Sequence, residues 1–330
     1  MIYPALTYPV LMLLLIVSSL LSLSMGSSDV VVFKGLWEWI FQQETLDAIV
    51  VGDIRLPRTL IALLVGAALG LSGAALQGLL RNPLADPGLT GASQGAALGA
   101  AAVFYFGVFP QAGGAAPAMA GLLGAGLAMM LMLFLAGSAR QSMVIMAGLA
   151  ISTLTGALLA MVLNFAPNPY AMQELVFWLL GSVANRGFEH LWILLPALII
   201  GGGLVFSQRR LLFGLSLGEN VATSLGLSTR WGSRLVVLGA AILVGTAVSI
   251  AGAIGFVGLI VPHLVRPFVS NRPDKVLFPS ALAGAILVCL ADTLIRSLPP
   301  GPELKLGVLT SLLGTPLFIW LIWRERRRWL

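Results

Sequence analysis

The chain has 330 residues, of which 58% are hydrophobic and only 10% are charged, and its formal net charge is +6. Soluble domains contain about 25% charged residues, so this composition excludes a soluble globular protein, a disordered chain and a nucleic-acid-binding module. With a single cysteine, Cys289, no intrachain disulfide can form, and the thiolates for zinc or an iron–sulfur cluster are missing. The composition therefore predicts an all-α polytopic membrane protein.

Stretches without charged residues predict the spanning helices, because a helix needs about 20 apolar residues to cross the hydrocarbon layer. The stretch 87–139 is long enough for two helices and is broken between Pro110 and Pro117, and the stretch 235–265 is broken near Gly252. The ten predicted crossings come, in chain order, from residues 1–28, 59–80, 87–139 (two), 141–173, 190–208, 235–265 (two), 276–291 and 306–323.

The distribution of charge supports this topology. With both termini in the cytoplasm, 13 of the 19 Lys and Arg residues lie inside, together with only 4 of the 13 acidic residues. A single crossing in 235–265 would move the basic tail 324–328 outside. The apolar segment 173–182 is too short to span and is predicted to be a helix on the outer surface. Segment 1–28 lacks a basic start, so we do not expect a cleaved signal peptide.

The sequence lacks the motifs of an enzyme. None of Lys34, Lys275 and Lys305 is followed by Ser or Thr, so there is no Walker A motif. The two histidines, His190 and His263, are far apart and are predicted on opposite faces, which argues against a metal or hydrolytic site. We therefore expect no catalytic residue, metal or cofactor in this chain. If ATP drives its activity, ATP and Mg²⁺ must bind to a separate subunit.

One cytoplasmic connection, 207–233, is much longer than the others. Short helices at the inner face either lie on lipid or fill a groove of a partner. The neutral or acidic residues Glu219, Asn220 and Thr223 favour the partner, because a lipid-bound helix usually carries Lys and Arg on its polar face. Three glycines are expected to divide the segment into two short helices: Gly214, Gly218 and Gly226.

From about residue 53 to its end the chain contains a series of ordered motifs. They are RLPRTL (55–60), GAALQ (73–77), RNPLADPGL (81–89), LGENVATSLGL (217–227), GAIGFVGLIVPH (252–263), Ala291-Asp292 with Arg296, GVLT (307–310) and GTP (314–316). Together these motifs resemble the FecCD family of ABC-importer permeases. This resemblance implies a single transmembrane permease domain, 1–330, with the type II ABC importer fold, and 207–233 as its cytoplasmic coupling loop.

The resemblance also implies partners and a location. These are a second permease subunit, expected as a homodimer, two ABC ATPases, and a periplasmic or lipid-anchored substrate-binding protein, all at the bacterial inner membrane. It implies that Arg55, Arg58 and Arg296 on the outer face pair with glutamates of the binding protein. The alternative is that these arginines reach into the headgroup region of the membrane.

The same resemblance assigns residues at the inner face. The expected ATPase-coupling residues are Leu217, Gly218, Glu219, Ala222, Leu225, Gly226 and Leu227. The expected cytoplasmic gate consists of Asn82, Leu84, Gln141 and Ser142. A gate there would open and close as ATPase movements are transmitted through the loop, in an alternating-access cycle.

The substrates implied are iron–siderophore complexes, haem or cobalamin. With only two histidines and four tyrosines, the chain has few candidate haem ligands, which favours a siderophore and leaves cobalamin open. Two alternatives to an ABC importer permease remain open. An ion-coupled secondary transporter would need a buried carboxylate within a span. An exporter permease or membrane scaffold would not need arginines on the outer face.

Overall fold

The computed structural model describes residues 4–26, 28–106, 116–137, 141–165, 169–298 and 304–329, and these residues form helices and loops without β-strands. The helices are α1 (Pro4–Ser24), α2 (Val32–Ile40), α3 (Leu46–Ala48), η1 (Ile49–Arg55), α4 (Leu56–Leu79), η2 (Pro87–Thr90), α5 (Ala92–Phe106), α6 (Ala116–Ala136), α7 (Gln141–Asn164), α8 (Pro169–Leu179), η4 (Phe188–His190), α9 (Leu191–Ser207), α10 (Arg209–Leu217), α11 (Glu219–Ser224), α12 (Thr229–Ala251), α13 (Val257–Val265), η5 (Arg266–Val269), α14 (Pro273–Ser297) and α15 (Leu306–Trp329).

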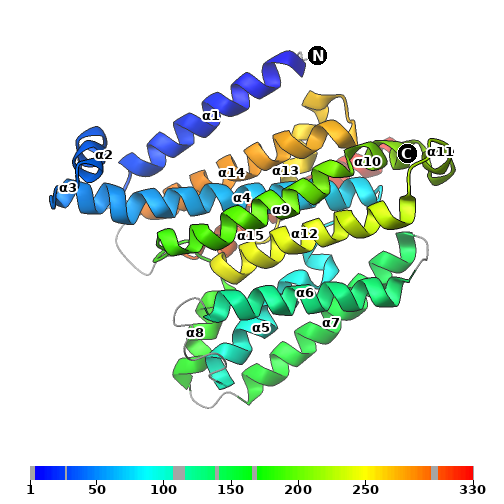
Figure 1. Cartoon of the computed structure of the whole chain (residues 1–330), viewed down its shortest axis with the longest axis horizontal. Coiled ribbons are helices and arrows are strands. Elements are labelled where there is room, and N and C mark those ends of the chain that lie inside the picture. The colour runs from blue at the N-terminus through cyan, green and yellow to red at the C-terminus, as the bar shows by residue number, and fades with distance from the viewer. Residues whose placement is uncertain are drawn as a thin grey trace.

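The long helices lie side by side along the long axis of the molecule (Figure 1). Helices α2 and α3 lie at one end, and α10 and α11 lie at the other. We call these the outer end and the inner end, following the topology expected from the charges. Both ends of the chain lie toward the inner end (Figure 1).

By length and composition, seven of the described helices are able to cross a membrane. They are Leu6–Ser24, Leu46–Leu79, Ala116–Ala136, Met146–Asn164, Phe188–Ser207, Thr229–Ala251 and Pro273–Ser297. Three other expected crossings correspond to shorter helices: α5 with 15 residues, Val257–Val269, and the apolar part of α15, Leu306–Trp320. Seven helices therefore meet these criteria, and the ten crossings stay a prediction.

The expected break in 235–265 is confirmed. Helix α12 ends at Ala251 and α13 begins at Val257. Gly252 ends α12 with a φ of 71°, in the left-handed region that favours glycine, and a Cβ there would overlap the carbonyl oxygen of Trp178. The break in 87–139 is also confirmed by the separate helices α5 and α6, although the connection that contains Pro110 lies outside the described residues.

Two helices begin earlier than the sequence predicted. The span expected from residue 59 begins at Leu46 and continues through the π-helix η1 into α4. Thr45 caps its first turn by accepting a hydrogen bond from Ala48 N at 3.2 Å. The short outer helix expected at 173–182 is α8, which begins at Pro169. Charge alone is therefore a poor guide to a boundary when the charged side chains have partners inside the protein.

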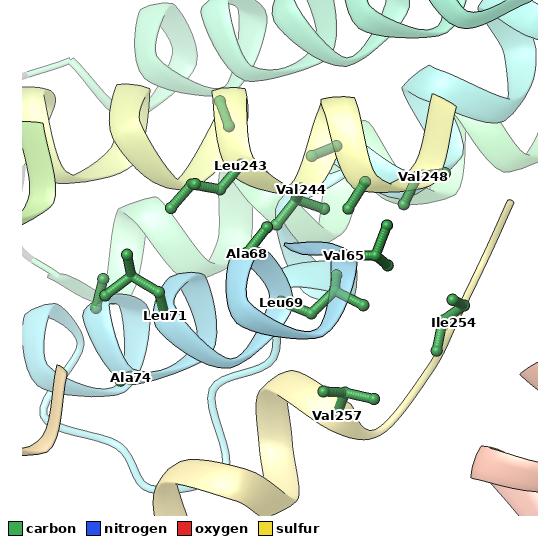
Figure 2. Close-up of a cluster of buried hydrophobic side chains, with 14 of the residues drawn as sticks. Val65, Ala68, Leu69, Leu71, Ala74, Leu243, Val244, Val248, Ile254 and Val257 are labelled. Atoms are coloured by element: carbon green, nitrogen blue, oxygen red, sulfur yellow. The ribbon is translucent and has the colours of Figure 1, made fainter. Parts of the chain in front are cut away.

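Helix α4 lies at the centre of the bundle, where it packs against α14, α12, α13 and α9. In the most apolar stretch of the span that contains α4, 78% of the residues are buried, against 22% in the peripheral helix α1. Figure 2 shows Val65 and Ala68 of α4 on the side of the helix that faces Val244 of α12, with Val257 of α13 below α4. Because these side chains are small or β-branched, the three helices approach closely.

Glycines expected to allow close helix contacts do so. A Cβ on Gly66 would overlap the carbonyl oxygen of Gly284 in α14, and a Cβ on Gly99 of α5 would overlap the carbonyl oxygen of Ala120 in α6. The expected pairs Gly66/Gly70 and Gly95/Gly99 therefore mark two seams in which backbones touch, α4 with α14 and α5 with α6.

Candidate functional site

At the outer end two arginines, Arg58 and Arg296, share the carboxylate of Asp292, and Arg55 lies at the same end with other partners. We call Arg55, Arg58, Asp292 and Arg296 the outer arginine cluster. Asp292 on α14 is only 2% exposed. Its Oδ1 accepts a hydrogen bond from Arg58 Nη2 at 2.8 Å, and its Oδ2 accepts one from Arg58 Nε at 3.0 Å. This side-on arrangement of a guanidinium and a carboxylate is the strong, directional form of the ion pair.

Arg296 shares the same carboxylate and also holds the end of α1. Its Nε lies 3.1 Å from Asp292 Oδ2, one helical turn away on α14. Its Nη1 donates to the carbonyl oxygens of Ser22 and Met25 at 3.0 and 3.2 Å, and Nη2 lies 2.6 Å from Ser22 Oγ. The guanidinium thus satisfies carbonyl groups that the last turn of a helix leaves without partners.

Arg55 makes a different set of contacts. Its Nη1 donates to the carbonyl oxygens of Leu23 and Ser24, both at 2.9 Å, and its Nη2 donates to that of Ser28 at 2.6 Å. The side chain is therefore enclosed at the end of the π-helix η1, with the residue only 4% exposed. Arg55 caps the C-terminal end of α1, where a cation is also favoured by the helix dipole.

The structure brings the three predicted docking arginines together, but it directs them inward. The side chains of Arg58 and Arg296 are 15% and 9% exposed. Their expected contact with glutamates of a binding protein stays a prediction. The sequence reasoning missed their internal partner, Asp292, although its four-residue spacing from Arg296 on one helix was a usable signal.

At the inner end, α10 and α11 form the two short helices expected in 207–233. Gly218, with a φ of 120°, separates them, and Gly226, with a φ of 73°, follows the second. The expected break at Gly214 is wrong, because this glycine lies within α10. A Cβ there would come within 2.7 Å of Leu227 Cδ1, so Gly214 is small for packing and not for a turn.

The predicted coupling residues divide into an exposed set and a supporting set. Leu217 and Leu225 are 54% and 61% exposed, and the neighbouring Val221 is also exposed. Ala222 is fully buried against Gly214, and Leu227 is half-buried. An exposed row of apolar side chains on a rigid base is the arrangement that a partner protein recognises. We call Leu217, Val221 and Leu225 the inner apolar row.

A small pocket lies beside this row. Its volume is about 110 Å³, and its lining includes Glu219, Arg230 and Arg234 together with apolar residues of α4, α6 and α7. Residues of α11, α12 and α4 line this pocket together, and α11 packs against α10 and α12.

The structure describes half of the predicted gate. Asn82 Oδ1 accepts a hydrogen bond from Leu84 N at 2.9 Å, a local turn that exposes the Leu84 side chain. Asp86 then caps η2 by accepting from Gly88 N at 2.7 Å; burial raises the pKa of this carboxyl, and the hydrogen bond opposes that shift. Helix α7 begins at Gln141, but the side chains of Gln141 and Ser142 lie outside the described part of the structure.

A buried contact that sequence reasoning missed joins this loop region to α13. Gln77, on α4, is almost fully buried, and its Nε2 donates to the carbonyl oxygen of Leu259 at 3.0 Å. Its Oε1 accepts from Arg266 Nη2 at 2.8 Å. Gln77 thus ties the inner part of α4 to α13 and to the residue that follows it.

Among the residues that the structure describes, no group of three or more His, Cys, Asp or Glu side chains is placed to hold a metal ion. The described residues form a charged outer end, an exposed apolar row at the inner end, and closely packed helices between them.

Comparisons with known proteins cover almost the whole chain. Residues 14–324 match the FecCD transport family. The haemin transport system permease protein HmuU of Yersinia pestis is 38% identical over 338 residues, which cover 99% of this chain and 98% of that protein. The vitamin B12 import system permease protein BtuC of Salmonella paratyphi A is 38% identical over 328 residues, covering 96% and 94%.

A solved structure shares the fold as well as the sequence. It is described as an inward-facing conformation of a metal-chelate type ABC transporter. It superposes with a TM-score of 0.86 at 32% identity, over 98% of this chain and 100% of that one.

Proposed function

Because the chain belongs to the FecCD transport family, we propose that it is the permease subunit of a type II ABC importer that takes up a metal chelate. The observation that carries this proposal is the match over nearly full length to a haemin permease and a vitamin B12 permease. The similarity to the fold of a metal-chelate transporter supports it.

The proposed energy source is a pair of ABC ATPases that dock on the inner apolar row. Exposed Leu217 and Leu225 offer the apolar contact, and buried Ala222 holds α11, the short helix between them, in place. ATP-driven movement of α11 is transmitted to α12 and opens or closes the gate near Asn82 and Leu84. The bound ATP and Mg²⁺ belong to the partner subunits.

The proposed cargo receptor is a substrate-binding protein that docks at the outer end, where Arg55, Arg58 and Arg296 concentrate positive charge. Charge complementarity speeds the encounter of two proteins and sets their orientation. The permease works as a homodimer in the inner membrane of a bacterium, with both termini in the cytoplasm and ten crossings.

The preferred cargo is an iron–siderophore complex, with haem and cobalamin as alternatives. The relatives matched equally well carry haemin and vitamin B12, so overall identity does not choose between these cargoes. The sparse histidines and tyrosines of the chain favour a chelate whose iron stays bound to its own ligand.

The test of this function is uptake in vesicles that contain the permease with its ATPase and binding protein. We expect ATP-dependent uptake of a labelled ferric siderophore, exceeding that of haemin or cobalamin. Arg58→Glu together with Arg296→Glu should abolish uptake, and Lys34→Glu, a surface change at the same end, should not. Accumulation by the permease alone in an ion gradient would refute the proposal in favour of a secondary transporter.

A second test addresses the coupling loop. Deleting Gly218–Leu227 should prevent co-purification of the ATPase with the permease, since it removes α11 and the exposed Val221 and Leu225. The deleted variant must still elute as a folded protein in detergent. ATPase binding that survives the deletion would refute the assignment of this loop.

A further inference from the structure

We infer that Asp292 is an internal counter-ion that competes with a docking partner for Arg58. The inference rests on the proposed docking at the outer end and adds a residue to it. In this arrangement, a carboxylate of the binding protein replaces Asp292 at the Arg58 guanidinium, so that docking is an exchange of one ion pair for another.

The geometry sets up an exchange at one edge of the Arg58 guanidinium. The two oxygens of Asp292 contact the Nε and Nη2 atoms of Arg58 at 2.8 to 3.2 Å. Asp292 itself is buried, and the Arg58 side chain is 15% exposed. A partner's carboxylate cannot engage the Nε and Nη2 edge while Asp292 occupies it. A partner that pairs with this edge therefore displaces Asp292 from it.

The charge balance makes exchange feasible. Two guanidiniums, those of Arg58 and Arg296, share the one carboxylate of Asp292, and Arg55 adds a third guanidinium at the same end of the bundle. The cluster therefore carries a surplus of positive charge in a partly buried setting, where the field acting on an approaching carboxylate is weakly screened. When Arg58 leaves, Arg296 still lies 3.1 Å from Asp292, so the carboxylate is not left buried without a cation.

The contacts of the other two arginines single out Arg58. Arg55 and Arg296 donate to main-chain carbonyl oxygens at the end of α1, from Ser22 to Ser28, and moving either one would expose those groups. Arg58 is held on Asp292 by three hydrogen bonds and is the most exposed of the three side chains. An approaching partner therefore reaches Arg58 before the other two arginines.

The test compares Asp292→Asn with wild type in nanodiscs that contain the permease and its ATPase. The probe is the binding protein that restores uptake together with this permease. Because asparagine keeps the shape but removes the competing charge, we expect docking to tighten on the order of tenfold. Asp292→Glu, which keeps the charge, should dock like wild type. The matched control is Asp274→Asn, which removes another Arg–Asp pair at the opposite end of α14.

A second readout does not depend on the binding protein. Phenylglyoxal should modify Arg58 several-fold faster in Asp292→Asn than in wild type, as measured by mass spectrometry of the folded protein. If the single variant does not fold, the charge-balanced pair Asp292→Asn with Arg296→Gln is compared with Arg296→Gln alone, and tighter docking by the pair is expected.

Unchanged or weaker docking by Asp292→Asn would overturn the inference, because a residue that merely supports the fold cannot tighten docking when it is removed. Such a result would leave the proposed function intact as long as wild type binds. A wild-type complex that binds no binding protein would instead refute the proposed docking itself.

Discussion

The outer and inner ends of this bundle present their recognition groups in opposite ways. At the outer end, Arg58 and Arg296 are folded back onto buried Asp292. At the inner end, Leu217 at the end of α10 and Leu225 at the end of α11 are already exposed. Under the proposed function, a partner would bind the inner end without rearrangement, whereas at the outer end side chains would have to rearrange first. We therefore expect substitutions at the inner end to weaken partner binding additively. Substitutions at the outer end should instead act through the exchange of ion pairs.

The largest expected effect concerns the packing of α4, which runs between the two ends, against α13. A Cβ on Gly73 of α4 would overlap the carbonyl oxygen of Gly258 in α13, a backbone atom that cannot move alone. Gly73→Ala should therefore abolish folded protein, measured as the monodisperse yield in detergent. At Gly78, a Cβ would lie 3.4 Å from Pro273 Cβ, an ordinary contact, so Gly78→Ala on the same helix should fold. Equal yields of the two variants would contradict the close backbone contact between α4 and α13.

The next effect separates docking from folding at the inner end. Leu225→Asp places a charge on an exposed position of the inner apolar row and should weaken ATPase binding by about 30-fold or more, as for a central contact residue of an interface. The unfolding temperature of the permease should stay unchanged. Ala222→Asp, at a buried position of α11, should lower both ATPase binding and the unfolding temperature. If Leu225→Asp binds the ATPase normally, the row is not the docking surface.

A smaller effect tests Arg55 as the anchor of α1. Arg55→Gln removes charged hydrogen bonds to three carbonyl oxygens, which contribute about 1.5–3 kcal/mol where a charged group is involved. Thermal unfolding should move to lower temperature, and α1 should become more sensitive to protease. Arg55→Lys should recover only part of the loss, because one ammonium does not reproduce the planar fork of a guanidinium. Unchanged stability would contradict the capping role.

The smallest expected effect lies at the outer surface. Lys34 pairs with Glu38 and Asp47 at 3.6 and 3.1 Å, but its side chain is exposed. These acids raise the pKa of Lys34, and water screens the pair. Lys34→Ala should change neither the unfolding temperature nor uptake. A clear loss would show that this surface, and not the outer arginine cluster alone, takes part in docking.

Much of the candidate site was accessible from the sequence. Glycine positions and charge runs predicted the break after α12 and the two short helices α10 and α11, because these features depend on local backbone preferences. Leu217 and Leu225 were assigned as coupling residues by the family resemblance, and the structure shows that both are exposed. The reasoning was wrong at Gly214, since a glycine kept small for a contact with Leu227 is indistinguishable in sequence from one kept for a turn.

By itself, the sequence determined that this is a multi-pass helical membrane protein, which family it resembles, and which end carries which kind of residue. Hydrocarbon imposes length and polarity on every crossing, so these properties are written along the chain. Only the tertiary structure decided where the outer arginines point. Arg58 and Asp292 are 234 positions apart, and whether such side chains meet depends on how α4 and α14 pack against each other. That packing is set by backbone contacts at Gly66 and Gly284, and no local pattern around either charge specifies it.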